Sequence, residues 1–236
     1  MPTIVFASPK GGAGKSTSAV VLASELAQKG AGVVVIDADP NRPVSAWASR
    51  PGRPGSLVVL SEVTEESIIE EIENAAARAP FVVVDLEGTA SMTVAYAISR
   101  ADLVIIPVQG SQLDAAEAAK AIRLIRRQEK AFARAIPHVV LFTRTSAAIR
   151  PRTLRHIRSE LDRAGVRILK TQMHEREAFR AIFSFGGTLA TLEASQVANL
   201  SAAITNARAL AAEIVSELRL TSVNERGSVD VRAEVA

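Results

Sequence analysis

Residues 8–17 read SPKGGAGKST and directly follow residues 3–7, an apolar and β-branched run typical of a buried strand. Neighbouring glycines let backbone N–H groups converge on phosphate oxygens, while Lys15 and Ser16 add an ammonium and a hydroxyl at the end of the loop. Apolar residues then recur at helical spacing over residues 15–28. This order predicts a phosphate-binding loop, with Lys15 on the β- and γ-phosphates and Ser16 on Mg²⁺.

The remainder of the chain alternates short apolar runs with helical patterns, which is typical of βαβ units. We expect an α/β fold: a doubly wound, mostly parallel sheet with helices on both faces. The expected strands are 3–7, 32–37, 57–60, 81–85, 103–108, 138–143 and a weaker one at 166–170. The expected helices are 15–28, 43–48, 65–78, 93–99, 115–134, 151–164, 175–183 and 194–218. Residues 1–220 are expected to form a single domain, and residues 221–236 a polar, disordered tail.

Composition excludes several classes of protein. The 236 residues are 48% hydrophobic, which is ample for a core, and contain no cysteine. Disulfide frameworks, thiol nucleophiles, cysteine zinc sites and iron–sulfur clusters are therefore excluded. No apolar run approaches the roughly 18 residues that span a bilayer, and the first residues lack the features of an export signal. These observations predict a cytoplasmic protein without a membrane partner.

The charge distribution is strongly uneven along the chain. Residues 120–180 hold sixteen Lys or Arg and five acidic residues, a net charge of +11. Because the whole chain carries +3, the remainder carries −8. Such asymmetry within one domain indicates a polyanionic partner or a strongly polarised surface.

Part of this charge follows helical spacing. In the helices expected at 115–134 and 151–164, basic residues recur at spacings that place them in one stripe per helix. Few acids and no aromatic residues accompany them, which favours sequence-independent contact with DNA phosphates over base recognition. A solvated helix face neutralised by acids elsewhere in the fold is the alternative. The candidate DNA-binding residues are Arg123, Arg126, Arg127, Lys130, Arg152, Arg155, Arg158 and Arg163, with Arg134 continuing the first stripe.

The phosphate loop departs from the common G-x-x-x-x-G-K-[ST] form, because Pro9 occupies the first glycine position and Lys10 adds a second lysine. This KGGxGK[ST] form resembles the deviant Walker A motif of the ParA/MinD family of P-loop ATPases. The resemblance implies that Lys10 reaches across a nucleotide-sandwich dimer to the partner's phosphates. A second cation there would neutralise charge that develops in phosphoryl transfer. The resemblance also implies which residues bind ATP or ADP: Lys10, Gly11, Gly12, Ala13, Gly14, Lys15, Ser16 and Thr17.

Two further motifs agree with the resemblance. The run VIDADP at 35–40 is similar to the family's D-x-D-P motif, which implies that Asp39 is a catalytic carboxylate positioning the attacking water and that Asp37 supports Mg²⁺. The run FVVVD at 81–85 has the form of a Walker B strand, which implies that Asp85 faces Mg²⁺ through water. The family commonly continues D-x-P, whereas this chain has Glu87 at that point. The conformation of the segment after Asp85 and any role of Glu87 therefore stay open.

The resemblance also implies an adenine site in the loops after the late strands, where Thr143 and Met173 are the candidates. Within the family, the resemblance is closest to the short ParA plasmid-partition proteins, since no helix-turn-helix domain precedes the phosphate loop. Residues 172–179 are in addition similar to ParA-like proteins of plasmid conjugation systems. The 223–230 segment is not basic or amphipathic enough for the membrane helix of MinD.

From the resemblance we expect an ATP-dependent DNA partition ATPase with slow, Mg²⁺-dependent turnover, catalysed by Lys10, Lys15 and Asp39. ATP would form a homodimer that binds nonspecific DNA on the nucleoid, and a ParB-like partner would stimulate hydrolysis and release. The alternatives are a ParA-like positioning ATPase for a protein cargo, such as a chemoreceptor array, microcompartment or conjugation complex, and a metabolic P-loop ligase or kinase.

Overall fold

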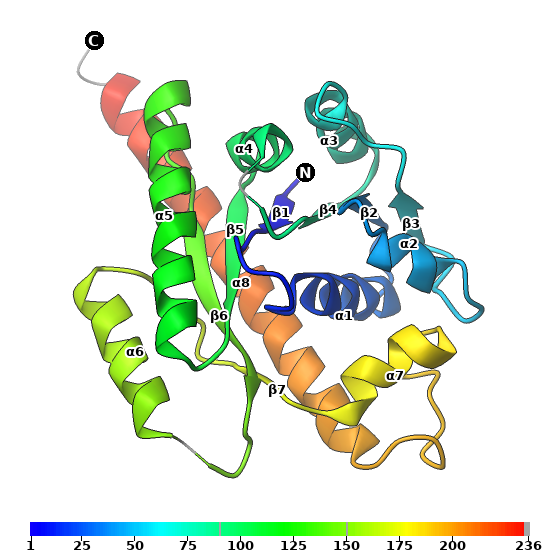
Figure 1. Cartoon of the computed structure of the whole chain (residues 1–236). Helices are drawn as coiled ribbons and strands as arrows, with labels where there is room; N and C mark the ends of the chain where they lie inside the picture. Colours follow the sequence, from blue (N-terminus) through cyan, green and yellow to red (C-terminus); the bar gives the residue numbers. More distant parts are fainter. Residues whose placement is uncertain (90, 150, 234–236) are drawn as a thin grey trace.

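The computed structural model describes residues 1–89, 91–149 and 151–233, and its centre is a seven-stranded sheet (Figure 1). All strand pairs are parallel, in the order β3-β2-β4-β1-β5-β6-β7. The predicted doubly wound α/β fold is thereby confirmed. The strands are β1 (Thr3–Phe6), β2 (Val33–Ala38), β3 (Leu57–Leu60), β4 (Phe81–Leu86), β5 (Leu103–Val108), β6 (His138–Thr145) and β7 (Met173–His174).

Helices cover both faces of the sheet because successive strand residues alternate between the faces. Phe6 and Val35 pack with α1, α2, α7 and α8, whereas Val5 and Ile36 pack with α3, α4, α5 and α6. Figure 1 shows these two helical layers. The helices are α1 (Lys15–Gln28), α2 (Pro43–Ala48), α3 (Ile68–Arg78), α4 (Met92–Ser99), α5 (Gln112–Phe132), α6 (Arg152–Arg163), α7 (Glu177–Phe185) and α8 (Leu200–Ala233).

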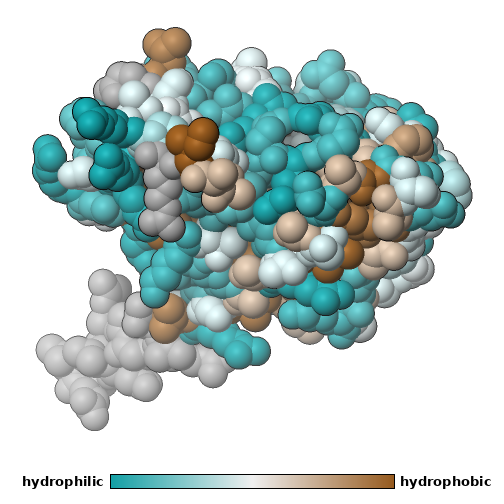
Figure 2. All heavy atoms as spheres, turned by 90° about the horizontal axis from the view of Figure 1, so that it is seen from below, coloured by the Kyte–Doolittle hydropathy of each residue, from teal (hydrophilic) through white to brown (hydrophobic). Residues whose placement is uncertain are grey.

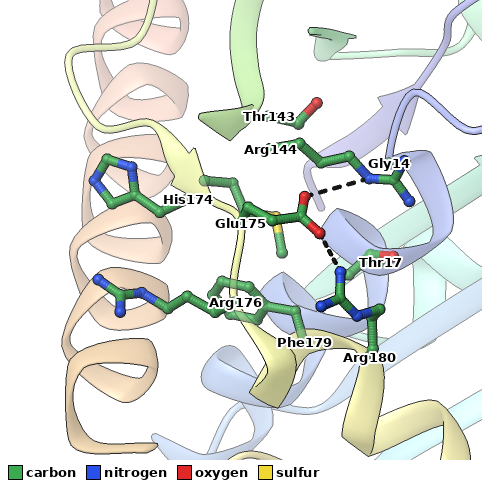
Figure 3. A pocket seen from close by; sticks show the side chains of 10 residues that line it. Gly14, Thr17, Thr143, Arg144, His174, Glu175, Arg176, Phe179 and Arg180 are labelled. Atoms are coloured by element: carbon green, nitrogen blue, oxygen red, sulfur yellow. Dashed lines mark hydrogen bonds and ion pairs between the residues drawn. The ribbon is translucent and has the colours of Figure 1, made fainter. Parts of the chain in front are cut away.

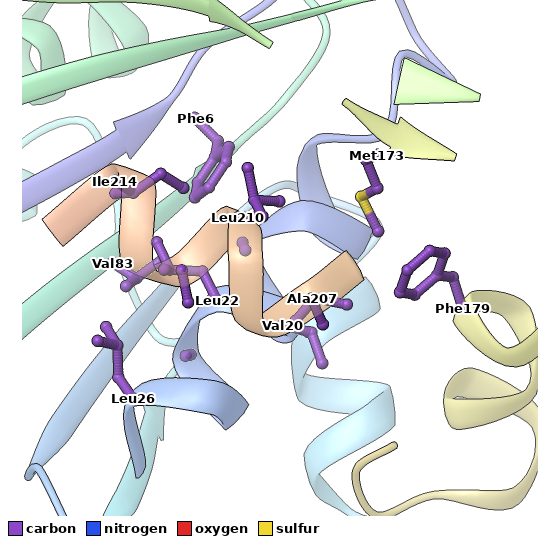
Figure 4. Packing of buried hydrophobic residues seen from close by; sticks show 14 of the residues in the cluster. Phe6, Val20, Leu22, Leu26, Val83, Met173, Phe179, Ala207, Leu210 and Ile214 are labelled. Carbon is purple, nitrogen blue, oxygen red and sulfur yellow. The ribbon is translucent and has the colours of Figure 1, made fainter. Parts of the chain in front are cut away.

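Helix α1 is buried along almost its whole length, between the sheet and α8. Leu22 of α1 and Leu210 of α8 belong to one apolar cluster with Phe6 and Val83 of the sheet (Figure 4). Burial of such side chains contributes roughly 1.5–3 kcal/mol each to folding. The phosphate loop is thus attached at one end to a central strand and at the other to the most buried helix.

Two predicted elements are wrong at the end of the chain. The strand expected at 166–170 is absent from the described structure there, where only Ile168 bridges to Val140, and β7 lies at Met173–His174 instead. The last helix runs over Leu200–Ala233 rather than 194–218. Residues 219–233 contain one glycine and no proline to stop it, so the expected tail is helical as far as Ala233. Residues 234–236 of that tail lie outside the described residues, and the domain boundary at 220 stays a prediction.

The surface seen from below is largely hydrophilic, with hydrophobic side chains in small groups (Figure 2). Within the described part of the chain, no helix is long and apolar enough to cross a membrane.

The order of strands creates a switch point at β1. The chain passes from β1 to β2 on one side and later from β4 across β1 to β5 on the other. Loops at the carboxyl ends of strands diverge at such a point and leave a crevice for a ligand. The loop at 8–17 leaves β1 there, and the register pairs Asp37 with Asp85 on the neighbouring strands.

Candidate active site

A cleft of about 500 Å³ opens at this switch point, a size suited to a small-molecule ligand. The glycines of the loop, Lys15 and Ser16 form one wall, and the loops after β2 and β4 contribute Asp39 and Glu87. Three motifs that lie far apart in the sequence are therefore brought together. Most of the predicted phosphate, metal and catalytic residues line this cleft, and Asp37 and Asp85 lie at the strand ends beneath Asp39 and Glu87. Ala13 is buried within the loop, and Lys10 lines an adjoining cavity.

Glycine is required within the loop because two residues adopt left-handed backbone conformations, Gly12 at φ 74° and Gly14 at φ 98°. Gly14 also caps α1, so that Lys15 is the first helical residue and the helix N-terminus faces the cleft. Side chains from other strands hold the loop from behind. Thr143 donates a hydrogen bond to the Ala13 carbonyl at 2.7 Å, and Gln109 donates one to the Gly12 carbonyl at 2.8 Å.

Lys15 is only 5% exposed, which is unusual for a lysine. Burial lowers the pKa of its ammonium, while the charges of Asp85, Asp39 and Glu87 raise it. Its Nζ donates a hydrogen bond to the carbonyl oxygen of Lys10 at 3.4 Å, its closest hydrogen-bond partner among the described residues. The ammonium is therefore held within the loop, facing carboxylates on the opposite side of the cleft.

The inner carboxylates provide a test of whether Mg²⁺ fits. Asp37 is 1% exposed and Asp85 0% exposed. Asp37 accepts hydrogen bonds on Oδ2 from the Ser45 N–H and hydroxyl, both at 2.7 Å, yet its Oδ1 and both Asp85 oxygens have no hydrogen bond of normal geometry among the described residues. Buried carboxylate oxygens without partners are costly unless a cation compensates them. Together with the Ser16 hydroxyl, this set of oxygen donors fits Mg²⁺.

Burial raises the pKa of Asp85 to about 7, opposed by the nearby Ser16 hydroxyl and Lys15 ammonium and reinforced by Asp37. Because Asp85 holds its proton more tightly in the folded state than in the unfolded state, stability falls as pH rises from about 4 to about 7.

We expect the substitution Asp85→Asn to remove this loss of stability with rising pH. Without nucleotide or metal, the free energy of unfolding of the variant, measured with urea, should rise by about 3 kcal/mol relative to that of the wild type between pH 5 and pH 8. Identical pH profiles for Asp85→Asn, the wild type and the exposed control Asp162→Asn would contradict this.

In the structure, the Lys10 side chain forms an ion pair with helix α5 of its own chain. Its Nζ lies 2.6 Å from Oδ1 of Asp114, which is 3% exposed on its side chain and completes a capping box with Ser111 at the start of the helix. Burial acts to raise the pKa of Asp114, but the bonds from Lys10 and Ser111 outweigh it and the pKa lies below its usual value. A role of Lys10 on a partner's phosphates requires this ion pair to open.

A smaller pocket, of about 40 Å³, lies next to Gly14 and Thr17 (Figure 3). Thr143 and Met173, the predicted adenine residues, both line it and both are buried. Glu175 lies across the pocket between two arginines, paired with Arg144 at 3.7 Å and in closer contact with Arg180. Adenine contact stays a prediction, and an entering base would have to displace this bridge.

The predicted DNA-binding residues form what we call the α5–α6 basic surface. Helices α5 and α6 lie side by side over one face of the sheet (Figure 1), and the basic side chains are exposed except for the half-buried Arg158. No ion pair with a described residue is found for any of them, although Arg163 bonds the Ser159 hydroxyl. Its members are Arg123, Arg126, Arg127, Lys130, Arg152, Arg155, Arg158 and Arg163.

Several other basic residues of the segment 120–180 form ion pairs with acidic residues. Arg134, which the spacing places in the first stripe, instead donates to the backbone oxygens of Ser99 and Ala101 and pairs with Asp102. Arg167 pairs with Glu217 of α8. Acids from elsewhere in the fold therefore remove part of the excess charge but leave the α5–α6 basic surface. Arg150 lies outside the described residues.

Arg144 and Glu175 were missed by the sequence analysis. Arg144 has φ 52° at an irregularity in the pairing of β6 with β7, and it borders the phosphate cleft, the cavity beside Lys10 and the smaller pocket next to Gly14. No sequence signal marks a non-glycine residue at positive φ, because the conformation depends on strand pairing. The contact of Asp114 with Lys10 also depends on the fold, because the two residues lie far apart in the sequence.

Comparisons with known proteins show what the chain is similar to. The family model described as VirC1 protein matches residues 1–223. The chain is 46% identical to Protein ParA of Rhizobium radiobacter over 218 residues, 92% of this chain and 98% of that protein. It is 26% identical over 210 residues to the maintenance of carboxysome distribution protein A of Halothiobacillus neapolitanus, 84% and 94% of the two chains. The structure of apo McdA from Cyanothece superposes with a TM-score of 0.71 at 17% identity, over 88% of this chain and 99% of that one.

Proposed function

The chain belongs to the VirC1 family of ParA-like P-loop ATPases, and from this premise we propose that it is a DNA-partition ATPase that binds nonspecific DNA in its ATP state. At family level it is a ParA-like partition or positioning ATPase that uses a nucleotide and Mg²⁺. The finer proposal concerns what the ATP switch controls.

One observation carries the proposal: a single helix, α5, joins the phosphate loop to the basic surface. The first turn of α5 holds Lys10 through Asp114, and later turns of the same helix carry Arg123, Arg126 and Arg127. Helices transmit displacement as rigid elements. A change at the phosphate loop that frees Lys10 therefore alters how α5 is held and how its arginines are presented.

The residues of the cleft take the roles that the motifs imply. Lys15 and the loop N–H groups bind the phosphates, with Gly11, Gly12, Ala13, Gly14 and Thr17 forming the cradle. Ser16, Asp37 and Asp85 hold Mg²⁺, which supplies positive charge against the phosphate oxygens when bound. Asp39 accepts a hydrogen bond from the attacking water, and its Oδ1 is itself fixed by the N–H and side-chain amide of Asn41 at 2.9 and 3.0 Å.

In this proposal Lys10 leaves Asp114 and reaches the partner's phosphates, so that ATP closes a homodimer. The dimer brings two α5–α6 basic surfaces together on one DNA, which raises affinity through the number of phosphate contacts. A ParB-like partner stimulates an otherwise slow hydrolysis, and the monomers release the nucleoid DNA. Residues 1–220 act as the single ATPase domain.

A second candidate is a positioning ATPase that moves a protein cargo. The relationship to a protein named for maintaining carboxysome distribution favours it. The cleft chemistry would be the same, so the cargo partner distinguishes the two. A neighbouring gene for a ParB-like protein favours partition, and one for a cargo adaptor favours positioning.

The dimer is tested by light scattering of the wild type, Asp39→Ala and Lys10→Ala with no nucleotide, ADP or Mg²⁺-ATP. We expect the mass to double only with ATP, to stay doubled for longer in Asp39→Ala, and not to double in Lys10→Ala. A monomer in every state, with nucleotide still bound, would contradict the proposal.

A further inference from the structure

Glu87 occupies the place where this chain departs from the D-x-P pattern. The register of β2 and β4 pairs Asp37 with Asp85 and Ala38 with Leu86. The next residues along these neighbouring strands are Asp39 and Glu87, and both line the phosphate cleft. The two strands thus place two pairs of carboxylates at the cleft. Asp37 and Asp85 are buried beneath it, and Asp39 and Glu87 are half-buried at its mouth.

Gly88 fixes the position of Glu87 against the phosphate loop. A Cβ on Gly88 would lie 2.9 Å from the backbone nitrogen of Gly11 and 3.2 Å from the carbonyl carbon of Lys10. Only glycine lets the segment after β4 approach the loop this closely. Glu87 is therefore held at the phosphate end of the cleft by its own backbone, which leaves its side chain free for another role.

The Glu87 carboxylate has no polar partner among the described residues. The structure gives its carboxylate no hydrogen bond or ion pair with any described residue, whereas Asp37 is anchored by Ser45 and Asp114 by Lys10. Its charge does reach the cleft, since it is among those that raise the pKa of Lys15. A carboxylate held beside the phosphate-binding lysine, without a structural partner, is available to the reaction.

We propose that Glu87 is a catalytic residue that, together with Asp39, orients the water attacking the γ-phosphate. A water molecule has two O–H groups, and two carboxylates can accept both, which leaves a lone pair directed at phosphorus. The water oxygen forms a bond to phosphorus as the bond from phosphorus to the bridging oxygen of ADP breaks, and the proton released by the water ends on inorganic phosphate. This inference rests on the proposed ATPase function.

The test compares Glu87→Gln, Glu87→Asp and Glu87→Ala with Asp39→Ala and the double variant Asp39→Ala/Glu87→Gln. Phosphate release gives kcat and KM, and titration with a fluorescent ATP analogue under non-turnover conditions gives Kd. We expect Glu87→Gln to lower kcat about 10- to 100-fold while Kd changes less than about twofold, with partial activity in Glu87→Asp. Glu62→Gln, which alters an exposed glutamate paired with Arg42, should match the wild type.

Because the two carboxylates act on one water, the double variant should be only a few-fold slower than Asp39→Ala alone. Wild-type kcat in Glu87→Gln, or an effect confined to KM and Kd, would overturn the role of Glu87 while the ATPase proposal stands. A wild-type protein that binds no ATP would overturn the ATPase proposal itself. Unchanged Kd in Glu87→Gln shows that the variant is folded.

Discussion

Lys15→Ala is expected to eliminate measurable ATP turnover and to weaken nucleotide binding by at least about a hundredfold. The Lys15 ammonium is buried in the loop and, among the described residues, is the one cation of the cleft that does not have to leave an ion pair to reach phosphates. Charge-assisted hydrogen bonds to phosphate are roughly twice as strong as neutral ones, and removing several of them costs about 3 kcal/mol or more. Fluorescent-nucleotide titration and phosphate release measure both effects.

The matched control is Lys29→Ala, at the other end of the same helix, where the lysine lies outside the cleft. It should retain wild-type affinity and turnover. If Lys15→Ala bound ATP within about threefold of the wild type, the loop would not be the phosphate site and the assignment of the cleft would fail.

Charge reversal on the α5–α6 basic surface is expected to have the second large effect, which is a loss of affinity for DNA without a change in ATP hydrolysis. In the ATP state, Arg126→Glu should weaken binding to random-sequence duplex DNA about tenfold, and Arg126→Glu/Arg127→Glu about a hundredfold. The slope of log K against log salt should fall by about 0.9 for each phosphate that the variant no longer neutralises. Fluorescence anisotropy at several salt concentrations measures both quantities, and ATP hydrolysis without DNA should be unchanged.

Arg78→Glu is the matched control, because it makes the same change of charge at an exposed site in the last turn of α3, far along the sheet from α5. An equal decrease of DNA binding in Arg78→Glu and Arg126→Glu would mean that net charge matters and that the α5–α6 basic surface has no special role.

Elements with strong local signals were predictable from the sequence. Helix α1 begins at Lys15 after a glycine at positive φ, and α2 begins at Pro43, where proline favours a first turn; both have the predicted bounds. The cleft was predictable for a similar reason, since parallel strands deliver their loops to one edge of the sheet. Asp37, Asp39 and Asp85 each follow an apolar run that can only be a buried strand.

The β7 region was not predictable because side chains from α8 complete its backbone hydrogen bonds. Glu213 accepts the N–H groups of Lys170 and Thr171, and Asn206 accepts that of His174. These contacts replace the regular strand ladder expected at 166–170. The Lys10–Asp114 ion pair depends in the same way on tertiary structure, since it joins residues 104 positions apart.

The claim that ATP controls DNA binding is tested most directly by anisotropy on a random-sequence duplex. The wild type is measured with no nucleotide, with ADP and with Mg²⁺-ATP, and Asp39→Ala with Mg²⁺-ATP. The account predicts binding only with ATP, tighter binding in Asp39→Ala because the ATP state persists, and a steep decrease with salt. A protein that binds ATP but shows the same DNA affinity in all four states would contradict it.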